Sequence, residues 1–403
     1  MALLFISLMN PFDSNCPVGG AETSMKLIAS GLAEMGHRVF FVTHRPSKQS
    51  RKKAKSLGVQ LISFPLPFAM HRNLIRVTMF IFAIQLFTIT VSRKITSVYC
   101  YYEVFSVASL KTVGKLLPKL FITMRIAGLS WRDFRRTSRW HEKIYKTVFQ
   151  RLDQVNYIHA DLKEATEKEC LQAGISLRRA RVFVGDIGTP VSELGNFREK
   201  KSLRHGHFTA IVPTRFSGAK RQDLIVEALK LLPADLDITI QFAGAGIRKS
   251  SVERMANDCL PKHRYKFLGF LSQQELWARI GAANLVILPT DYEGLSKVTL
   301  ESMAIGTPVM ASNVIPLNNY ITSNKTGFLV ENTPKAWADA LNEVFRSPEK
   351  LTKVIEPAQQ FVTEKYSSAK NLALYEQKIV QQKTGTNEGG STTNPSGRIS
   401  NPE

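Results

Sequence analysis

Short apolar runs alternate along this chain with longer stretches in which apolar residues recur every three or four positions. The short runs are rich in β-branched residues and are typical of strands, whereas the longer stretches are typical of amphipathic helices. Regular alternation of the two predicts parallel sheets covered by helices, so the expected fold class is α/β. In the first half of the chain the predicted strands are residues 3–8, 38–43, 60–64, 97–100, 121–125 and 154–158, and a helix is predicted over 23–35.

A second alternating series follows a stretch at 185–207 that is rich in Gly, Pro and charge, which we interpret as an interdomain connection. Its predicted strands are 208–213, 238–243, 266–268, 285–289, 308–311 and 327–330, with helices at 223–231, 273–281, 297–305 and 334–345. Because 403 residues suit two ordinary cores, we expect two domains. The N-terminal one is 1–190 with a closing helix at 367–383, the C-terminal one is 208–366, and 384–403 is a disordered tail.

Composition narrows the class of protein. Apolar residues at 44% and charged residues at 22% are typical of a soluble globular chain. The four cysteines lie far apart and the eight histidines form no metal-binding spacing, so we expect no disulfide framework, no bound metal and no other cofactor.

Positive charge is concentrated at one end of the chain. The formal net charge is +21, and residues 1–150 hold 22 Lys and Arg against 6 Asp and Glu. Such a domain should attract an anionic partner, which can be nucleic acid, a phosphorylated substrate or anionic lipid. Charge alone does not choose among the three.

Two apolar segments bear on membrane association. Residues 1–8 lack the basic start and the cleavage site of a signal peptide, so we interpret them as a buried strand. Residues 74–91 are nearly all apolar but fall short of the roughly 20 apolar residues that a spanning helix needs. We expect a buried or membrane-grazing helix there.

The strongest chemical signal lies between a buried strand and a helix, where Glu293 is on the loop and Glu301 is more than a turn into the helix. The backbone N–H groups of Gly294, Leu295 and Ser296 precede that helix, and a helix N-terminus attracts phosphate. Carboxylates accept hydrogen bonds from the vicinal hydroxyls of sugars. The segment therefore suits a ligand that carries both a diphosphate and a sugar, although a simple helix cap beside a solvated glutamate fits it too.

Two further strand ends offer complementary groups. Arg215 and Lys220 follow the strand 208–213, and Gly244 and Gly246 follow the strand 238–243. In open α/β sheets, ligands bind at the carboxyl ends of the strands. Cations there can neutralise a departing pyrophosphate, and glycines allow close approach of the backbone.

Taken in order, these segments resemble the retaining family-four glycosyltransferases (glycosyl transferases group 1), which have the GT-B fold. The resemblance covers nearly the whole chain and is clearest over 208–330. It is carried by Gly19-Gly20-Ala21-Glu22 after the first strand, Arg215 and Lys220, Gly244-x-Gly246, Glu293 and Glu301 separated by seven residues, and Met303-Ala304-Ile305-Gly306-Thr307-Pro308-Val309.

The resemblance implies a role for each matching residue. Arg215 and Lys220 would bind the donor diphosphate, Glu293 the transferred sugar and Glu301 the nucleotide ribose. The amides near Gly294, Leu295 and Ser296 would contact sugar and phosphate, with Gly19 and Gly20 approaching from the other domain and the backbone near 268–271 contacting the base. It also implies a last helix that crosses back to the N-terminal domain and a reaction without a protein nucleophile or a metal.

The sequence departs from the family pattern at three places. Arg221 stands where the family usually has Gly, and Ser296-Lys297 replaces a common glycine-containing pair. The family's His-Gly pair corresponds to Met124-Arg125-Ile126-Ala127-Gly128, and the sequence leaves open whether Arg125 replaces the histidine. Asp235-Leu236-Asp237 mimics a metal-binding DxD sequence, but it follows Pro233 and precedes a strand, so we interpret it as a turn.

Two basic stripes are predicted on the N-terminal domain. Lys48, Arg51, Lys52 and Lys55 have helical spacing, and Arg132, Arg135, Arg136 and Arg139 repeat it beside Trp131, Phe134 and Trp140. Each stripe can be a solvated helix face. Two stripes with interfacial aromatic residues favour an anionic membrane surface or a pyrophosphate-linked acceptor.

The sequence therefore predicts a cytoplasmic, membrane-peripheral retaining glycosyltransferase. It would move a hexose from a UDP- or GDP-sugar to a glycan or lipid-linked acceptor in cell-surface polysaccharide or glycolipid synthesis. The alternatives are another sugar-nucleotide enzyme of the same architecture, an epimerase or phosphorylase, and a non-catalytic basic nucleic-acid-binding protein. The last would leave Glu293 and Glu301 without a role.

Overall fold

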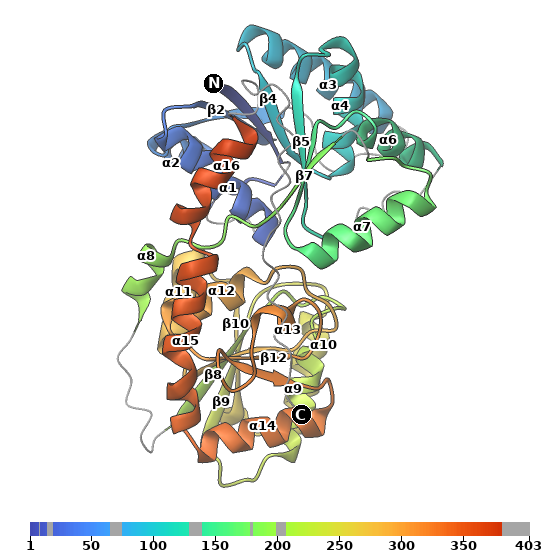
Figure 1. The fold of residues 1–403 in the computed structure, drawn as a ribbon. Helices are drawn as coiled ribbons and strands as arrows, with labels where there is room; N and C mark the ends of the chain where they lie inside the picture. Colours follow the sequence, from blue (N-terminus) through green and yellow to red (C-terminus); the bar gives the residue numbers. More distant parts are fainter. Residues whose placement is uncertain are drawn as a thin grey trace, which may run out of the picture.

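A computed structural model describes residues 1–7, 9–13, 19–64, 75–128, 139–177, 180–198 and 207–380, with side chains undescribed at 75, 76, 104, 105 and 140. The described chain forms two parallel sheets, each covered by helices on both faces, one above the other in Figure 1. We call the part around the first sheet the N-terminal domain and the part around the second the C-terminal domain. The predicted α/β fold class of two Rossmann-like domains is confirmed.

The N-terminal sheet has the strand order β3-β2-β1-β4-β5-β6-β7, and every neighbouring pair is parallel. Strand β1, inside the sheet, is buried at every position, because helices cover both faces of the sheet. The strands are β1 (Ala2–Ile6), β2 (Arg38–His44), β3 (Val59–Phe64), β4 (Ser97–Tyr101), β5 (Phe121–Ile126), β6 (Gln154–Tyr157) and β7 (Arg181–Val184).

Alternate residues of β1 face two separate cores, since successive side chains of a strand point to opposite faces. Leu3 and Phe5 pack with helices α1 (Gly20–Glu34) and α2 (Lys48–Ser56) on one face. Leu4 and Ile6 pack with helices on the other face. Those helices are α3 (Ile75–Ser92), α4 (Val104–Leu116) and α6 (Arg139–Phe149), and α7 (Ala160–Gln172) follows β6.

The C-terminal sheet has the order β10-β9-β8-β11-β12-β13 and is also parallel. Its strands are β8 (Phe208–Pro213), β9 (Ile238–Ala243), β10 (Tyr265–Gly269), β11 (Leu285–Leu288), β12 (Val309–Ser312) and β13 (Phe328–Val330). The helices are α9 (Gln222–Leu231), α10 (Lys249–Cys259), α11 (Gln273–Ala282), α12 (Lys297–Ile305), α13 (Leu317–Tyr320), α14 (Pro334–Arg346) and α15 (Glu349–Lys365), with the short helix η2 (Lys262–Arg264) before β10.

The chain passes between the domains at two places that lie side by side. The first connection runs through α8 (Val191–Leu194) and η1 (Gly195–Phe197), and the second joins α15 to α16 (Ser368–Ile379). Thr189 N–H donates to the Tyr366 carbonyl at 2.7 Å, and Ser368 N–H donates to the Thr189 carbonyl at 2.9 Å. Gly188, with φ +79°, permits this approach, because a Cβ there would lie 1.8 Å from the Tyr366 oxygen.

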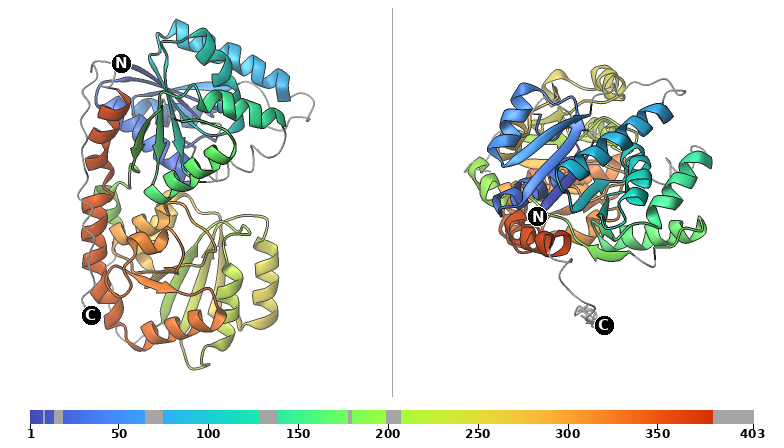
Figure 2. Two further views of the ribbon diagram at one scale, coloured as in Figure 1. Left: turned by 45° about the vertical axis from the view of Figure 1, so that its right-hand side comes forward. Right: turned by 90° about the horizontal axis from the view of Figure 1, so that it is seen from above.

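Helix α16 returns to the N-terminal domain and packs on α1, as the two views in Figure 2 show. It inserts the fully buried Tyr375 and Ile379 into the same core as Phe5 and Met25. His37 Nε2, just after α1, lies 3.0 Å from Glu376 Oε1 on α16. The predicted closing helix therefore exists over most of its length, whereas the predicted tail at 384–403 lies outside the described residues.

Within the part of the chain that the structure describes, no helix is long and apolar enough to cross a membrane. The apolar segment 74–91 forms α3, apart from residue 74, which is not described. Phe82 and Leu86 are buried in the core, but Phe80 and Ile84 are more than half exposed. The helix is thus buried on one face and apolar on the other.

Candidate functional site

A pocket of about 570 Å³ lies where the carboxyl ends of both sheets meet. It brings together residues that are far apart in sequence: Gly19 and Gly20 from the N-terminal domain, and Arg215, Lys220, Gly244, Gly246, Glu293, Leu295 and Ser296 from the C-terminal domain. All of these were predicted site residues. Met9, Phe270, Leu271 and Lys297 also line it.

The loop after β8 supplies the cations. Gln222 fixes this loop, because its side-chain amide donates to Thr214 Oγ1 at 2.9 Å and to the Arg215 carbonyl at 3.0 Å. The backbone of the loop after β9 packs closely against the backbone of the loop after β8. A Cβ at Gly244 or Gly246 would lie 2.3 Å from the carbonyl of Thr214 or Phe216, respectively, and both glycines have φ near +150°. These two glycines therefore allow the close contact that aims Arg215 into the pocket.

The loop between β11 and α12 supplies the first carboxylate. Glu293 forms an ion pair with Lys220, and each side chain is about one-fifth exposed. Lys220 also donates to Thr290 Oγ1 at 3.4 Å, whose hydroxyl is anchored on the Tyr292 carbonyl at 2.6 Å. Arg221, which departs from the family pattern, joins the same two loops through Asp291 Oδ1 at 3.0 Å. The cation and the carboxylate are thus held by a shared polar framework.

Helix α12 points its N-terminus at the pocket. Ser296 is the N-cap, and its hydroxyl accepts from the Thr299 N–H at 3.4 Å, while its own N–H donates to Tyr320 Oη at 3.2 Å. Among described residues, the N–H groups of Lys297 and Val298 have no recorded hydrogen-bond acceptor. Free donors at the positive end of a helix dipole can bind a phosphate or a sugar oxygen.

Glu301 lies one turn deeper in α12 and does not line the pocket as the described residues define it. It is 5% exposed. Burial raises the pKa of Glu301 to about 7, against opposing effects of Trp277, Lys297 and Gln273. Its ionisation is therefore balanced near neutral pH, which is unusual for a carboxyl group.

The N-terminal domain closes the other side of the pocket. The Gly19 N–H donates to Glu22 Oε2 at 2.9 Å, which fixes the start of α1. A Cβ at Gly19 would lie 3.9 Å from an Arg215 guanidinium nitrogen, and one at Gly20 would lie 2.9 Å from Lys297 Cγ. The two glycines therefore face Arg215 and Lys297 directly across the domain boundary.

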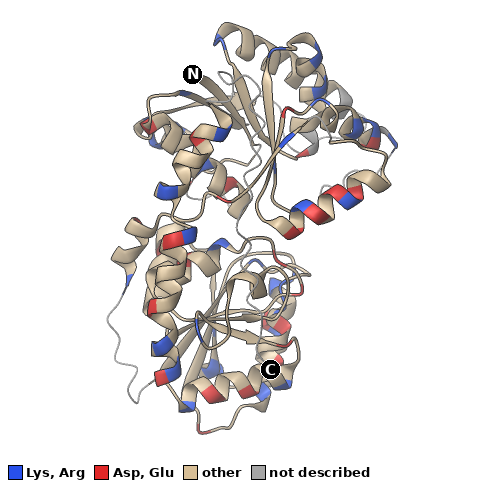
Figure 3. Ribbon diagram, viewed as in Figure 1, with Lys and Arg blue, Asp and Glu red and all other residues tan. Residues whose placement is uncertain are grey.

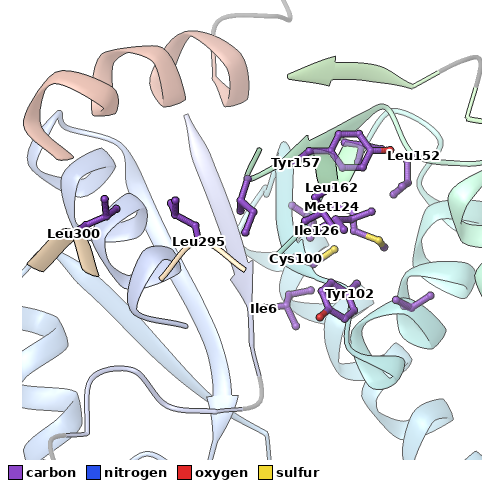
Figure 4. Packing of buried hydrophobic residues seen from close by; sticks show 14 of the residues in the cluster. Ile6, Cys100, Tyr102, Met124, Ile126, Leu152, Tyr157, Leu162, Leu295 and Leu300 are labelled. Atoms are coloured by element: carbon purple, nitrogen blue, oxygen red, sulfur yellow. The ribbon is translucent and has the colours of Figure 1, made fainter. Parts of the chain in front are cut away.

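Gly294 also meets the N-terminal domain, but outside the pocket lining. A Cβ on Gly294 would lie 3.1 Å from the Ala127 carbonyl at the end of β5. Leu295 and Leu300 belong to the same hydrophobic cluster as Ile6 and Met124, and Figure 4 shows this cluster on both sides of the boundary. The loop that carries Glu293 is thus packed against the N-terminal domain.

Arg125 does not reach the pocket. It is 1% exposed in the centre of the N-terminal domain, where it pairs with Asp186 and donates to Asn156 Oδ1 at 2.9 Å and Tyr375 Oη at 3.0 Å. Its guanidinium is occupied by these partners, so this structure gives it no contact with a donor sugar. The sequence could not predict this, because the three partners lie on β6, on the segment after β7 and on α16.

The remaining sequence predictions fall as follows. Lys48, Arg51, Lys52 and Lys55 lie exposed on α2, which confirms that helix. Arg139 begins α6 and is exposed, whereas Arg132, Arg135 and Arg136 lie outside the described residues. Asp235 and Asp237 precede β9 at the sheet edge opposite the pocket, where Asp237 Oδ1 lies 2.7 Å from His207 Nδ1. Among described residues, no group of His, Cys, Asp and Glu suited to a metal occurs.

Lys297 is the pocket residue that sequence reasoning noted but did not use. It stood out only as a departure from a glycine-containing pair. Its position could have indicated a role in the site, because Lys297 is the first residue of the helix predicted to carry Glu301. A side chain at that position lies beside the helix N-terminus, where a ligand would bind.

Comparisons with known proteins agree with this geometry. Residues 195–361 match the glycosyl transferases group 1. A D-inositol 3-phosphate glycosyltransferase of Paenarthrobacter aurescens is 28% identical over 158 residues, which are 37% of this chain and 38% of that protein. A GDP-mannose-dependent alpha-(1-6)-phosphatidylinositol dimannoside mannosyltransferase of Mycobacterium tuberculosis is 32% identical over 138 residues, 34% of this chain and 35% of that protein.

Among solved structures, Anabaena HepE in complex with UDP and glucose is similar with a TM-score of 0.71 and 16% identity. The match covers 94% of this chain and 99% of that one, and it confirms the GT-B fold. In sequence, the chain spans less than half the length of the curated relatives that it matches.

Proposed function

We propose that this chain, whose C-terminal domain belongs to the glycosyl transferases group 1, is a retaining glycosyltransferase that uses a nucleotide-sugar donor. The transferred hexose would pass to a glycan or lipid-linked acceptor in cell-surface polysaccharide or glycolipid synthesis. UDP and GDP are the favoured nucleotides, since HepE was solved with UDP and the mycobacterial relative is GDP-mannose-dependent. The family match favours this function over an epimerase, a phosphorylase or a nucleic-acid-binding protein.

One observation carries the proposal. The pocket joins two cations, Arg215 and Lys220, to the carboxylate of Glu293 and to the free end of α12. Cations and helix amides complement a diphosphate, and a carboxylate complements sugar hydroxyls. A nucleotide sugar carries both groups in one molecule.

In the proposed reaction the bond between the sugar's anomeric carbon and the diphosphate oxygen breaks, and a bond from that carbon to the acceptor oxygen forms. The acceptor's proton passes to the departing diphosphate, so no protein nucleophile and no metal are needed. Arg215 and Lys220 would stabilise the negative charge that develops on the diphosphate. Glu293 would orient the sugar, and Glu301 would accept hydrogen bonds from the ribose.

The same proposal includes the cytoplasmic face of an anionic membrane as the place of action. Between Met35 and Tyr102 the chain holds no acidic residue, and its basic residues there include Arg93 and Lys94 at the end of α3. On α3, Val77, Phe80, Ile81, Ile84 and Val91 are between 39% and 63% exposed. This spacing places them on one face of the helix.

A helix with an exposed apolar face and cations at its end suits the interface of an anionic bilayer. Figure 3 shows Lys and Arg spread over the N-terminal domain, whereas several of its Asp and Glu residues lie together on α7. We propose that α3 lies in the membrane surface, while the basic residues of α2 and of 132–139 add longer-range attraction. The acceptor would then reach the pocket from the N-terminal side.

The decisive experiment has two steps. Purified protein is first titrated calorimetrically with UDP, GDP, ADP and dTDP, and one of them is expected to bind with micromolar affinity. The matching nucleotide sugars are then incubated with membrane lipid extracts, and transfer of labelled sugar is measured together with its anomeric configuration. Binding of none of the four nucleotides would overturn the proposal, and a product of inverted configuration would overturn the retaining mechanism.

A further inference from the structure

A buried charge cluster behind the pocket joins the two domains. Asp186, which follows β7, pairs through Oδ2 with Arg125 of β5 and through Oδ1 with Lys297, the first residue of α12. The exposed side-chain fractions are 1% for Asp186, 1% for Arg125 and 8% for Lys297. Lys297 Nζ also donates to the Gly188 carbonyl at 2.6 Å. One carboxylate thus holds a cation from each domain.

The cluster is anchored on several elements of the N-terminal domain. Arg125 contacts Asn156 of β6 and Tyr375 of α16, and the Asn371 side chain donates to the Asp186 carbonyl at 3.1 Å. Burial alone would raise the pKa of Asp186, but Lys297 and Arg125 lower it to about 2. The carboxylate is therefore ionised at neutral pH and pairs with Lys297.

The cluster lies beside the two crossings between the domains. Gly188, which accepts from Lys297, directly precedes Thr189, and Thr189 exchanges backbone hydrogen bonds with Tyr366 and Ser368. Any rotation of one domain against the other must turn about these adjacent segments. A bond at this place from α12 to the N-terminal domain resists such rotation.

Lys297 is also part of the pocket. It lines the cavity, and its side-chain stem approaches Gly20 so closely that a Cβ there would lie 2.9 Å from Lys297 Cγ. Its backbone N–H belongs to the free end of α12. Lys297 therefore bonds to Gly188 beside the domain crossings, lies against Gly20 on the opposite side of the pocket, and begins helix α12.

We propose that Lys297 is a positioning residue: its pairing with Asp186 ties the N-terminus of α12 to the N-terminal domain and sets the spacing between α12 and the loop of Gly19 and Gly20. The inference rests on the proposed function, since that spacing is the width available to the donor diphosphate. Lys297 acts through α12 and needs no contact with the reacting atoms.

The charges in the cluster allow Lys297 to be replaced without leaving an unpaired buried charge. Lys297→Met removes one of the two cations and leaves Asp186 paired with Arg125, so the remaining buried pair is neutral and the fold should persist. Lys297→Arg keeps the cation and is the conservative variant. Lys335→Met is the matched control, because Lys335 also lies in the first turn of a helix and pairs with an Asp, but it is 80% exposed.

The first test measures the domain spacing without any nucleotide. Spin labels are placed at Leu171 and Ile247, which are 80% and 95% exposed on different domains, in a chain with Cys16 and Cys259 replaced by Ser. Double electron–electron resonance should give one narrow distance distribution for the unaltered site, for Lys297→Arg and for Lys335→Met. Lys297→Met should give a broader distribution. An unchanged distribution in Lys297→Met would overturn the inference, whether or not the protein binds nucleotides.

The second test uses the nucleotide that the wild type binds, UDP or GDP, and its sugar conjugate. Lys297→Met should weaken nucleotide binding and raise the donor KM about tenfold, the effect expected of one charge-assisted hydrogen bond. The thermal midpoint should change little, and Lys297→Arg should restore most of the affinity. A KM equal to that of the wild type would refute the positioning role, and a loss of stability without a change in KM would make Lys297 purely structural.

Discussion

At the scale of single residues, two of the charged side chains of the pocket are paired with each other. Lys220 and Glu293 compensate each other, and Thr290 and Asp291 hold the loops on which they lie. A sequence alone suggests such residues by their places after strands, but it does not reveal which of them pair. The side chain of Lys220, for example, is 18% exposed and bonded to Glu293.

Replacing Lys220 by Ala should lower kcat/KM by roughly 100-fold or more, because the cation would no longer stabilise charge on the leaving diphosphate. Steady-state transfer assays measure this. Lys230→Ala is the control, since Lys230 pairs with Glu227 on the exposed side of α9, away from the pocket. Turnover of Lys220→Ala within a few-fold of wild type would remove Lys220 from the site.

Replacing Glu301 by Gln should weaken nucleotide binding by about 1–3 kcal/mol, the range for a hydrogen bond to a charged group. Glu293→Gln should mainly lower turnover, since Glu293 is assigned to the sugar. Calorimetry with the free nucleotide distinguishes the two variants. Equal and undiminished affinities would refute the role of Glu301.

The same Glu301→Gln variant should also change how stability depends on pH. The pKa of Glu301 is raised from 4.5 to about 7 by burial, so the folded state binds more protons than the unfolded state between those values. This group therefore lowers the free energy of unfolding as pH rises through that window. Urea titrations from pH 5 to 8 should show Glu301→Gln gaining stability relative to wild type as pH rises.

At the scale of elements, the pattern of apolar residues was sufficient to predict the strands and the helix that carry the site residues. Strands β8 and β9 and helix α12 have the predicted bounds, because each is largely buried and a Pro or Gly marks its end. Strand β7 was not predicted, since three of its four residues are exposed at the sheet edge. Helices α10 and α15 were also missed: α10 has few buried positions, and α15 carries Pro357 in its interior, where a proline normally ends a helix.

Helix α3 offers the sharpest test of membrane docking. Replacing Phe80 and Ile84 together by Asn should reduce binding to vesicles of anionic lipid at least tenfold, because burying each side chain is worth on the order of 1–2 kcal/mol. Both residues are more than half exposed, so folding should be retained. Co-sedimentation at low and high salt measures the effect, with neutral vesicles as the comparison.

The basic stripe of α2 provides the matched variant in the same assay. Lys48, Arg51, Lys52 and Lys55 replaced by Gln should lower binding at low salt only, since attraction between exposed charges is screened within about 8–10 Å at physiological salt. Nucleotide affinity should stay unchanged in both variants. Wild-type protein that stays in the supernatant with anionic vesicles at low salt would contradict the membrane proposal.

At the scale of the whole molecule, the arrangement of the domains depends on the two connecting segments, which pass side by side from one domain to the other. The family resemblance implied that the last helix returns, but the register between Thr189 and Tyr366 depends on tertiary packing that no sequence pattern encodes. Arg125 shows the same limit, because its partners come from β6, α16 and the first crossing.

Replacing Gly188 by Ala should destabilise the protein by at least about 2 kcal/mol, since the residue has positive φ and its Cβ would collide with the Tyr366 carbonyl. Gly195→Ala is the control: its φ is −57° and nothing lies within 4 Å of the added atom. Chemical denaturation of both variants checks this. A Gly188→Ala protein as stable as Gly195→Ala would mean that the crossing is looser than the structure indicates.

The return of α16 also affects how the molecule is made. Tyr375 and Ile379 complete a core whose other members, such as Phe5 and Met25, lie far upstream and leave the ribosome well before α16. Domains generally fold as units during synthesis, N-terminal first. Here the N-terminal domain must wait, with part of its apolar core uncovered, until the C-terminal domain has been translated and α16, which covers that core, has emerged. A chaperone that binds apolar surface should therefore hold this nascent chain through the synthesis of the entire second domain.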